Sequence, residues 1–482
     1  MYNKYVMKKK ISLLLALLFL VIFYFLPESE TLSHEALCVI GIFLASLTMW
    51  IGVSIDWPSL ITILLIGFLP SFGFAKTFNS TFGNSTVMFL LFTFILVYPL
   101  SKTNFVRRTT ISLITNKIAI KGPWYFVSFL FIAETLLGLF ISPSVLFVAF
   151  LPFLEDIYNV LNLKKGSMSA NMLMLGTAFC ISLSSGMTPI GHVWPTLAMG
   201  AYQSATGISI NQFEYMAIGI PCGFILVALL ILVFKFIYKP NDINEINPKS
   251  ALSLKSTSLK ADKKEIIILS TVALVVILWI VPSLLKNVLP DVYTLINSWT
   301  TAMPPILGCI ILFLVTIDGK PIINFKEASE KGVMWGAILM TGAATLIAGA
   351  LQSVGVTDFL STILSPIADN LGEVGIVLFF VAWVVIQTNF FSNIVTTTIV
   401  STIAVSLLLT NNSVNLAVII CLIGFGAAIC NMTPAGQSTI NTVAIGSGYT
   451  TSKDMFIYGA IFAVLAIIVL ACVGYTIGTL VL

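Results

Sequence analysis

The chain has 482 residues, of which 58% are hydrophobic and 9% are charged, and its formal net charge is +4. A soluble domain carries about 25% charged residues, so this composition excludes a soluble protein and indicates a polytopic membrane protein. The seven cysteines are scattered through apolar stretches without the spacing of a metal-binding or redox pair. We also expect no nucleic-acid partner.

The chain begins with a lysine-rich segment followed by the apolar run 11–26. This outline resembles a signal peptide, but Pro27-Glu28-Ser29-Glu30 offers no small-residue cleavage site, so we expect a retained first span. Because a transmembrane helix needs about 20 apolar residues, the apolar runs predict about 11 transmembrane helices. They lie near residues 11–26, 36–51, 57–72, 84–100, 168–206 (broken), 215–237, 266–285, 299–316, 333–351, 416–450 (broken) and 455–480.

Two further apolar runs, 123–154 and 374–410, are predicted to be re-entrant helical hairpins. With the N-terminus in the cytoplasm, this layout keeps nearly all basic residues on the cytoplasmic side, as the positive-inside rule requires. One full crossing by either run would flip every later loop, and a crossing by the first run would export the Lys-rich linker 238–265. Two crossings need about 40 residues, more than separate Lys121 from Glu155. We therefore predict that the first hairpin opens to the cytoplasm and the second to the outside. The C-terminus is then outside a bacterial-type plasma membrane, the inner membrane.

Two hydrophilic stretches separate these elements. Lys102 to Lys117 is predicted to be an interfacial helix on the cytoplasmic surface. The linker 238–265 is rich in Asn and Lys, and we expect a solvated cytoplasmic tether. It divides the chain into an N-terminal repeat, 1–237, and a C-terminal repeat, 266–482.

The two halves carry matching polar motifs. Ile141-Ser142-Pro143-Ser144 is followed by Met187-Thr188-Pro189-Ile190-Gly191, and Phe391-Ser392-Asn393-Ile394 is followed by Met432-Thr433-Pro434-Ala435-Gly436. Because the two hairpins open to opposite sides, the repeats are inverted. Inverted repeats with interrupted helices are typical of secondary transporters, whose substrate site lies near the midplane where the breaks meet. The predicted fold class is thus an all-α polytopic membrane protein with two inverted repeats, two re-entrant hairpins and two broken helices.

This layout resembles the divalent anion/sodium symporter family, the INDY-type di- and tricarboxylate transporters, over nearly the whole chain. The signature of that family is Ser-Asn-Thr at each hairpin tip and a Thr-Pro break in the helix that follows. Here Ser392-Asn393-Ile394 keeps two of the three tip residues and Ser142-Pro143-Ser144 keeps one. The resemblance implies that tips and breaks bind the substrate carboxylates between two sodium ions, in an elevator-type homodimer.

The residues themselves predict a compatible anion site. Each tip and break directs helix N-termini into the protein, and such termini carry partial positive charge and unpaired N–H donors. Hydroxyl groups and the Asn393 amide add donors, although membrane helices commonly use such hydroxyls to satisfy their own backbone. Proline breaks a helix in either case. The candidate substrate-binding residues are Ser142, Pro143, Ser144, Thr188, Pro189, Ser392, Asn393, Ile394, Thr433 and Pro434.

The departures from the family signature bear on coupling. Pro143 has neither a backbone N–H nor an amide side chain, and Ile394 lacks a hydroxyl. We therefore predict that the sodium sites are degraded and favour sodium-independent exchange of one dicarboxylate for another. No metal ligand is certain, no cofactor other than Na⁺ is expected, and the vestigial sodium positions lie near Ser142, Gly191, Ser392 and Gly436.

Two ionisable residues are candidates for coupling or charge compensation. His192 follows the first break at the position that Gln437 occupies in the second repeat. It either offsets part of the substrate charge or pairs with backbone carbonyls at the break. Glu134 lies in the first hairpin arm, and ionisable residues at such depth are functional hypotheses. Proton carriage is its candidate role, although a short arm could leave it near cytoplasmic water.

Enzymatic functions are disfavoured, because the chain has no metal-binding pair of histidines, no Gly-rich phosphate loop and no pair of intramembrane aspartates. The expected function is transport of small dicarboxylates of the succinate, malate, fumarate and 2-oxoglutarate class. Sodium-coupled symport of dicarboxylate or citrate is the first alternative. An ion antiporter or a channel of the same broad superfamily is the second. A buried Asp in the second half would favour an antiporter, and this chain lacks one.

Overall fold

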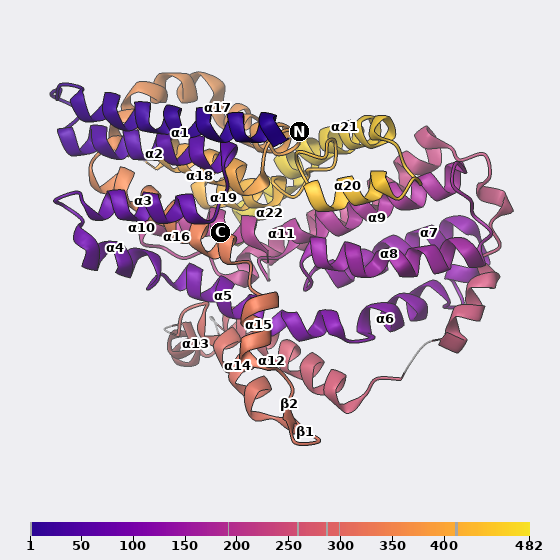
Figure 1. Cartoon of the computed structure of the whole chain (residues 1–482). Helices are drawn as coiled ribbons and strands as arrows, with labels where there is room; N and C mark the ends of the chain where they lie inside the picture. Colours follow the sequence, from indigo (N-terminus) through magenta and orange to yellow (C-terminus); the bar gives the residue numbers. More distant parts are fainter. Residues whose placement is uncertain (1, 191, 258–259, 286–287, 298, 410–412) are drawn as a thin grey trace.

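Helices run side by side through most of the molecule, here described by a computed structural model (Figure 1). The structure describes residues 2–190, 192–257, 260–285, 288–297, 299–409 and 413–482. Helices dominate because a backbone in hydrocarbon must satisfy its own hydrogen bonds. The first half contains α1 (Tyr2–Phe25), α2 (His34–Gly52), α3 (Trp57–Gly67), α4 (Gly73–Thr81), α5 (Ser85–Val97), α6 (Phe105–Ile114), α7 (Pro123–Gly138), α8 (Pro143–Val160), α9 (Met168–Met187), α10 (Val193–Thr206) and α11 (Gln212–Val233).

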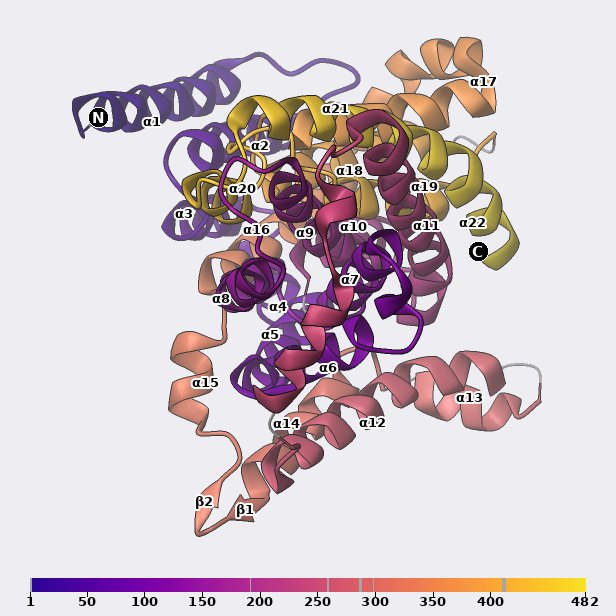
Figure 2. The same cartoon turned by 90° about the vertical axis from the view of Figure 1, so that its right-hand side faces the viewer.

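The second half follows the linker and contains one small strand pair, β1 and β2. Its elements are α12 (Lys263–Leu285), α13 (Pro290–Asn297), α14 (Met303–Leu314), β1 (Thr316–Ile317), β2 (Lys320–Pro321), α15 (Phe325–Lys331), α16 (Trp335–Ser353), α17 (Val356–Thr388), α18 (Asn393–Leu408), α19 (Leu416–Gly426), α20 (Ser438–Gly446), α21 (Ser452–Val469) and α22 (Tyr475–Val481). The β1–β2 hairpin projects at one edge of the molecule (Figure 2).

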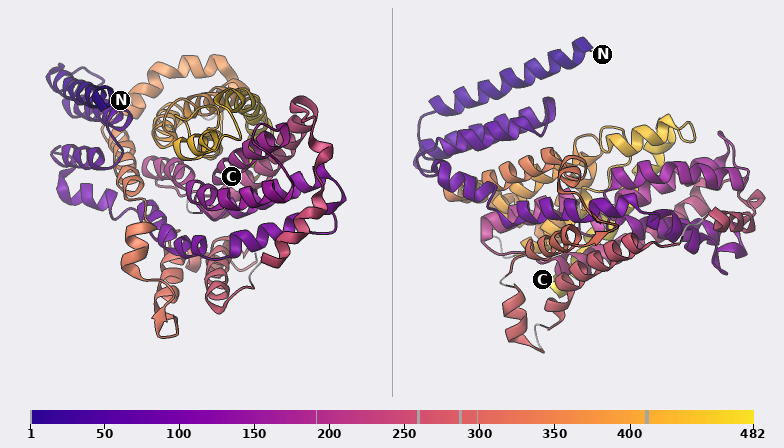
Figure 3. Two further views of the ribbon diagram at one scale, coloured as in Figure 1. Left: turned by 45° about the vertical axis from the view of Figure 1, so that its right-hand side comes forward. Right: turned by 60° about the horizontal axis from the view of Figure 1, so that its bottom comes forward.

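Nine candidate spans are present among the described residues, by length and composition. Five further apolar helices are shorter, and they include α7 and α18 of the two hairpins. The all-helical polytopic membrane class predicted from the sequence is confirmed, whereas the count of about 11 crossings stays a prediction. Helix α1 packs on α2 at the edge of the molecule (Figure 3), and most of its apolar side chains stay exposed, as expected for a surface in contact with lipid.

Each hairpin folds back on itself at a short polar tip. The first consists of α7 and α8, and Pro143 starts α8, where the missing N–H of proline costs no helical bond. The second consists of the C-terminal part of α17 followed by α18, which begins at Asn393. The two hairpins lie toward opposite ends of the bundle (Figure 1).

The broken helices run in opposite directions. Helices α9 and α20 lie toward one end of the bundle, and α10 and α19 lie toward the other (Figure 1). The chain therefore runs from α9 to α10 in one direction through the bundle, and from α19 to α20 in the opposite direction. This reversal is the arrangement that inverted repeats produce.

Segments predicted to share one side of the membrane lie at the same end of the bundle. At one end Arg107 pairs with Asp156 at 2.8 Å, and Asn171 Nδ2 donates to Asp454 Oδ2 at 2.9 Å. At the other end the Ser71 backbone N–H donates to the Glu35 carboxylate at 2.9 Å. These contacts join only segments that the charge pattern places together; which end faces the cytoplasm stays a prediction.

Helix α17 is longer than predicted. The expected hairpin begins at residue 374, but the helix starts at Val356 and changes direction at Gly372, which has φ 62° and ψ 175°. That positive φ is in a region that favours glycine. The segment before Gly372 thus leads into the hairpin as a separate helical arm that the apolar pattern did not indicate.

The linker between the repeats is packed along one face, which the expectation of a solvated tether did not include; its place in the cytoplasm stays a prediction. Within the linker, Ile243, Ile246, Ala251 and Leu254 are buried, and the segment packs against α6 and α8. Asp242 accepts hydrogen bonds from the backbone N–H and the hydroxyl of Ser169 at the start of α9. Apolar residues spaced between the lysines give the linker one face that can pack, so it fastens this end of the bundle.

Candidate functional site

In the first repeat, the hairpin is joined to the helix break by Thr188. Its hydroxyl donates to the Leu139 carbonyl, three residues before Ser142, at 2.7 Å. The same oxygen accepts from the Ile190 N–H at 3.3 Å, which stabilises the turn that Pro189 imposes on the break. The Thr188 side chain therefore holds the tip against the break.

The second repeat makes the same contact. The Thr433 hydroxyl donates to the carbonyl of Asn389, three residues before Ser392, and accepts from the Ala435 N–H at 3.2 Å. In this structure both threonine hydroxyls donate a hydrogen bond to a backbone carbonyl. These bonds join each tip to its break, and the predicted contact of the two hydroxyls with a bound anion stays a prediction.

His192 carries the side-chain contact of the first break. Its Nε2 lies 3.0 Å from the Gly138 carbonyl oxygen, and because a carbonyl can only accept, Nε2 carries the hydrogen. The residue is 1% exposed, and its Nδ1 has no hydrogen-bond partner among the described residues. Of the two predicted roles, pairing with a backbone carbonyl is the one that this geometry contains. The neighbouring Gly191 lies outside the described residues.

Four helix N-termini at the tips and breaks have no side-chain cap. Ser142 and Ser392 occupy the N-cap positions of α8 and α18, and His192 and Gln437 occupy those of α10 and α20, yet none of these side chains accepts from its helix. Elsewhere some helices are capped this way, for example by Ser33 and Ser167, and others, such as α6 and α16, are not. Uncapped N-termini leave backbone N–H donors and partial positive charge for an anion.

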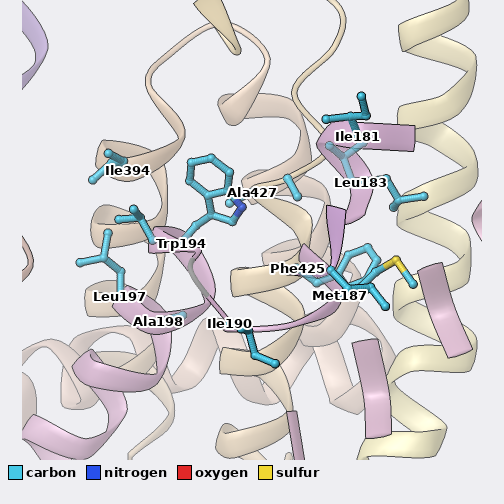
Figure 4. Close-up of a cluster of buried hydrophobic side chains, with 14 of the residues drawn as sticks. Ile181, Leu183, Met187, Ile190, Trp194, Leu197, Ala198, Ile394, Phe425 and Ala427 are labelled. Atoms are coloured by element: carbon cyan, nitrogen blue, oxygen red, sulfur yellow. The ribbon is translucent and has the colours of Figure 1, made fainter. Parts of the chain in front are cut away.

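The second tip differs from the first in the contacts of its residues. Asn393 Nδ2 lies 3.2 Å from Cys430 Sγ and 3.5 Å from the Ala427 carbonyl oxygen, so this amide is held against the second break. Ile394 is buried in the cluster that includes Trp194 and Leu197 of α10 (Figure 4). An apolar residue there packs against a neighbouring helix, which gives a physical reason for isoleucine where the family signature has threonine.

Burial also distinguishes the two breaks. Thr188 and Pro189 are buried, whereas Thr433 is half-buried and Pro434 is exposed. At the tips, Ser142, Ser144 and Ser392 are half-buried. The second break is therefore open to solvent in this conformation while the first is covered.

Glu134 is fully buried, at 0% exposed, so the expectation that it could lie near cytoplasmic water is wrong. Its Oε1 accepts from the Thr177 hydroxyl of α9 at 2.7 Å, and Oε2 has no hydrogen-bond partner among the described residues. No described ion pair includes it.

Three asparagines at the second break were not singled out from the sequence. Asn389 uses its side chain to bridge hairpin and break. Asn431 Nδ2 donates to Ser182 Oγ at 3.1 Å and to Asn441 Oδ1 at 3.1 Å, and so joins the two repeats. Asn441 in turn donates to the Thr433 carbonyl at 2.7 Å. The available signal was their polarity inside the long uncharged run between Glu373 and Lys453.

Comparisons with known proteins agree on transport. The family described as "Sodium:sulfate symporter transmembrane region" matches residues 7–482. An uncharacterized transporter of Haemophilus influenzae is 22% identical over 370 residues, which are 75% of this chain and 76% of that protein. An uncharacterized transporter of Methanocaldococcus jannaschii is 22% identical over 338 residues, 70% of each chain.

Among solved structures, the YdaH transporter of Alcanivorax borkumensis has a similar fold, with a TM-score of 0.59 at 13% identity over 92% of this chain and 98% of that one. The predicted class, a transporter and not an enzyme, is confirmed by these relatives. Because the family match covers nearly the whole chain, this multi-pass membrane transporter belongs to the sodium:sulfate symporter family.

Proposed function

We propose that the protein is a secondary transporter of small dicarboxylates of the succinate, malate, fumarate and 2-oxoglutarate class. The observation that carries this proposal is the set of four uncapped helix N-termini at the tips and breaks, where the sequence has no Lys or Arg. Backbone N–H groups and helix dipoles bind anions without a fixed cationic partner. Such binding is weak enough for release, as a carrier needs.

In this proposal the tips bind the carboxylates. Ser142, Ser144 and Ser392 offer hydroxyls, and the first turns of α8 and α18 offer N–H donors. Asn393 contributes its amide. The remaining candidates shape the site: Thr188 and Thr433 hold the tips, Pro143, Pro189 and Pro434 set the ends of the helices, and Ile394 packs on α10.

For coupling we favour sodium-independent exchange, because Pro143 and Ile394 remove groups from the family signature. Sodium-coupled symport, with ions near Ser142, Gly191, Ser392 and Gly436, is the second candidate, and the family description, which names sodium and sulfate, favours it. An isolated buried carboxylate is costly, so Glu134 is the group in this proposal that would bind a proton during transport.

Counterflow in proteoliposomes tests substrate and coupling together. We expect labelled succinate to enter vesicles loaded with unlabelled succinate, malate or 2-oxoglutarate, and to do so when choline replaces sodium. Loss of both uptake and exchange in choline would leave sodium symport. Transport of sulfate without succinate would reject the dicarboxylate class, and currents beyond carrier turnover would indicate a channel. The same assay on Glu134→Gln between about pH 5 and 8 tests proton coupling, which is rejected if that variant behaves like the parent.

We further propose an elevator movement in a homodimer, in which the hairpins and broken helices move against α2–α5 and α12–α16. Helix α10 packs along α16, and a Cβ placed on Gly349 would lie 3.9 Å from Ser204 Cβ. Disulfides span Cβ separations of about 3.5–4.5 Å. Oxidation of a Ser204→Cys/Gly349→Cys variant, in a background with the exposed Cys472 replaced by serine, is expected to stop transport until a reductant is added.

A matched pair within the stationary group provides the control. A Cβ on Gly342 of α16 would lie 3.5 Å from Thr81 Cβ of α4. The Thr81→Cys/Gly342→Cys disulfide should leave transport active. If both pairs form disulfides and neither one blocks transport, α10 does not move along α16 and the elevator proposal is wrong. Cross-linking of the protein in vesicles tests the homodimer.

A further inference from the structure

The two repeats dock hairpin on break with the same threonine bond but with different side-chain bonds. In the first repeat a side chain of the break reaches the hairpin, since His192 Nε2 donates to the Gly138 carbonyl at 3.0 Å. The residue that stands at the acceptor position of the threonine bond is Leu139, whose side chain forms no hydrogen bond. We call the side-chain bond that joins hairpin to break the lock of a repeat. In the first repeat the break supplies the lock.

In the second repeat a side chain of the hairpin reaches the break. Asn389 Oδ1 accepts from the Met432 N–H at 2.7 Å, and Asn389 Nδ2 donates to the Ile429 carbonyl at 2.6 Å and to the Val385 carbonyl at 2.7 Å. The residue is 0% exposed. Gln437, the counterpart of His192, has a buried Nε2 without a hydrogen-bond partner among the described residues. In the second repeat the hairpin, and not the break, therefore supplies the lock.

We propose that Asn389 is a positioning residue for the second tip and the functional counterpart of His192. Its carbonyl accepts from the Thr433 hydroxyl, and its side chain bonds to backbone groups of the break and of its own helix. It fixes the segment that carries Ser392 and Asn393 against the backbone of the second break, and so sets the separation between the α18 N–H donors and Thr433. This inference rests on the proposed function only in assigning substrate binding to the tips.

The geometry of the second break allows the two locks to be exchanged. Thr388 occupies the position of Gly138, and a Cβ on Gly436 would lie 2.7 Å from the Thr388 carbonyl oxygen. The break thus runs directly past the carbonyl that a histidine of the first type would use. Position 437 corresponds to His192, and Thr388 corresponds to Gly138, so a histidine at 437 is expected to donate to the Thr388 carbonyl. That bond would join hairpin to break as in the first repeat when Asn389 becomes leucine, the residue of the first repeat.

The test compares Asn389→Leu, Asn389→Asp and the double variant Asn389→Leu/Gln437→His with the parent and with Gln437→His alone. We expect Asn389→Leu to raise the half-saturation concentration of the transported anion about tenfold, equal to about 1.4 kcal/mol of binding free energy. Asn389→Asp keeps the acceptor for Met432 and should raise it less, about threefold. The double variant should return to within about threefold of the parent.

A second readout needs no substrate and is independent of the proposed function. In each background, Ser392→Cys reports how often the half-buried tip opens, through its rate of labelling by a maleimide. We expect faster labelling with Asn389→Leu and a return toward the parent rate with the added Gln437→His. An unchanged half-saturation and labelling rate in Asn389→Leu or Asn389→Asp overturns the proposal. So does a double variant that recovers thermal stability but neither of these two quantities, because Asn389 would then be purely structural.

Discussion

Asn393→Ala is expected to weaken substrate binding more than any single substitution at the first tip. The amide of Asn393 is held toward the second break by Cys430 and the Ala427 carbonyl. Hydrogen bonds to charged groups contribute about 1.5–3 kcal/mol, so losing the amide should raise the half-saturation concentration tenfold or more. Concentration-dependent exchange in proteoliposomes measures this, with ligand-dependent thermal stabilisation as an independent check.

The backbone adds to the asymmetry between the tips. Helix α8 starts with Pro143, which has no N–H, whereas α18 starts with Asn393, which has one. The first tip therefore offers one donor fewer to an anion. Ser144→Ala is the matched control, since it removes a half-buried tip hydroxyl and should change half-saturation by less than about threefold. Equal damage from Ser144→Ala at normal expression would show that the two tips contribute alike.

The hairpins and breaks could be predicted because burying polar groups in hydrocarbon costs free energy. A polar segment inside an apolar run therefore indicates an interrupted helix or a binding site. The motifs around Ser142, Thr188, Ser392 and Thr433 stood out as polar knots in apolar runs, and each threonine is found against the hairpin of its own repeat. Charge counting then assigned the hairpins to opposite ends, as the fold places them (Figure 1).

What the sequence did not reveal depends on contacts between distant segments. The role of the Thr188 hydroxyl is set by the Leu139 carbonyl, and a backbone acceptor leaves no sequence signal. The packing of the linker depends on the segment with buried Ala251 and Leu254 meeting α6 and α8, and the lysines around these residues give no sign of it. Asn389 gives no such signal, because it falls just outside the tip motif and has no polar counterpart in the first repeat, where Leu139 stands.

This difference between repeats bears on how the carrier could work. In the first repeat the lock is the imidazole of His192, a hydrogen-bond donor to the Gly138 carbonyl, and it lies in a break that is buried. In the second repeat the lock is an amide, which cannot titrate, and it lies beside a break whose Pro434 is exposed. The two inverted repeats therefore make the same threonine contact but join hairpin to break with chemically different side chains.

Gly436→Ala is expected to reduce transport strongly, because the second break has no room for a Cβ. An added Cβ would lie 2.6 Å from the Cys430 carbonyl oxygen, 2.7 Å from the Thr388 carbonyl oxygen and 3.1 Å from Asn389 Cα. All three atoms belong to the backbone, so no side chain can rotate away, and the hairpin must separate from the break. Overpacking of this kind costs about 1–3 kcal/mol and would displace the tip that the Thr433 and Asn389 bonds hold.

Gly446→Ala is the matched control for this substitution, since Gly446 lies at the end of α20, and an added Cβ there meets no atom within 4 Å. We expect Gly446→Ala to transport like the parent, and Gly436→Ala to reach the membrane but to lose at least about tenfold in exchange rate. Maleimide labelling of Ser392→Cys should become faster in Gly436→Ala, because separation of hairpin and break opens the tip. Normal exchange by Gly436→Ala would mean that the contact between Gly436 and Thr388 is not kept during transport, and that the tip is positioned by Asn389 and Thr433 alone.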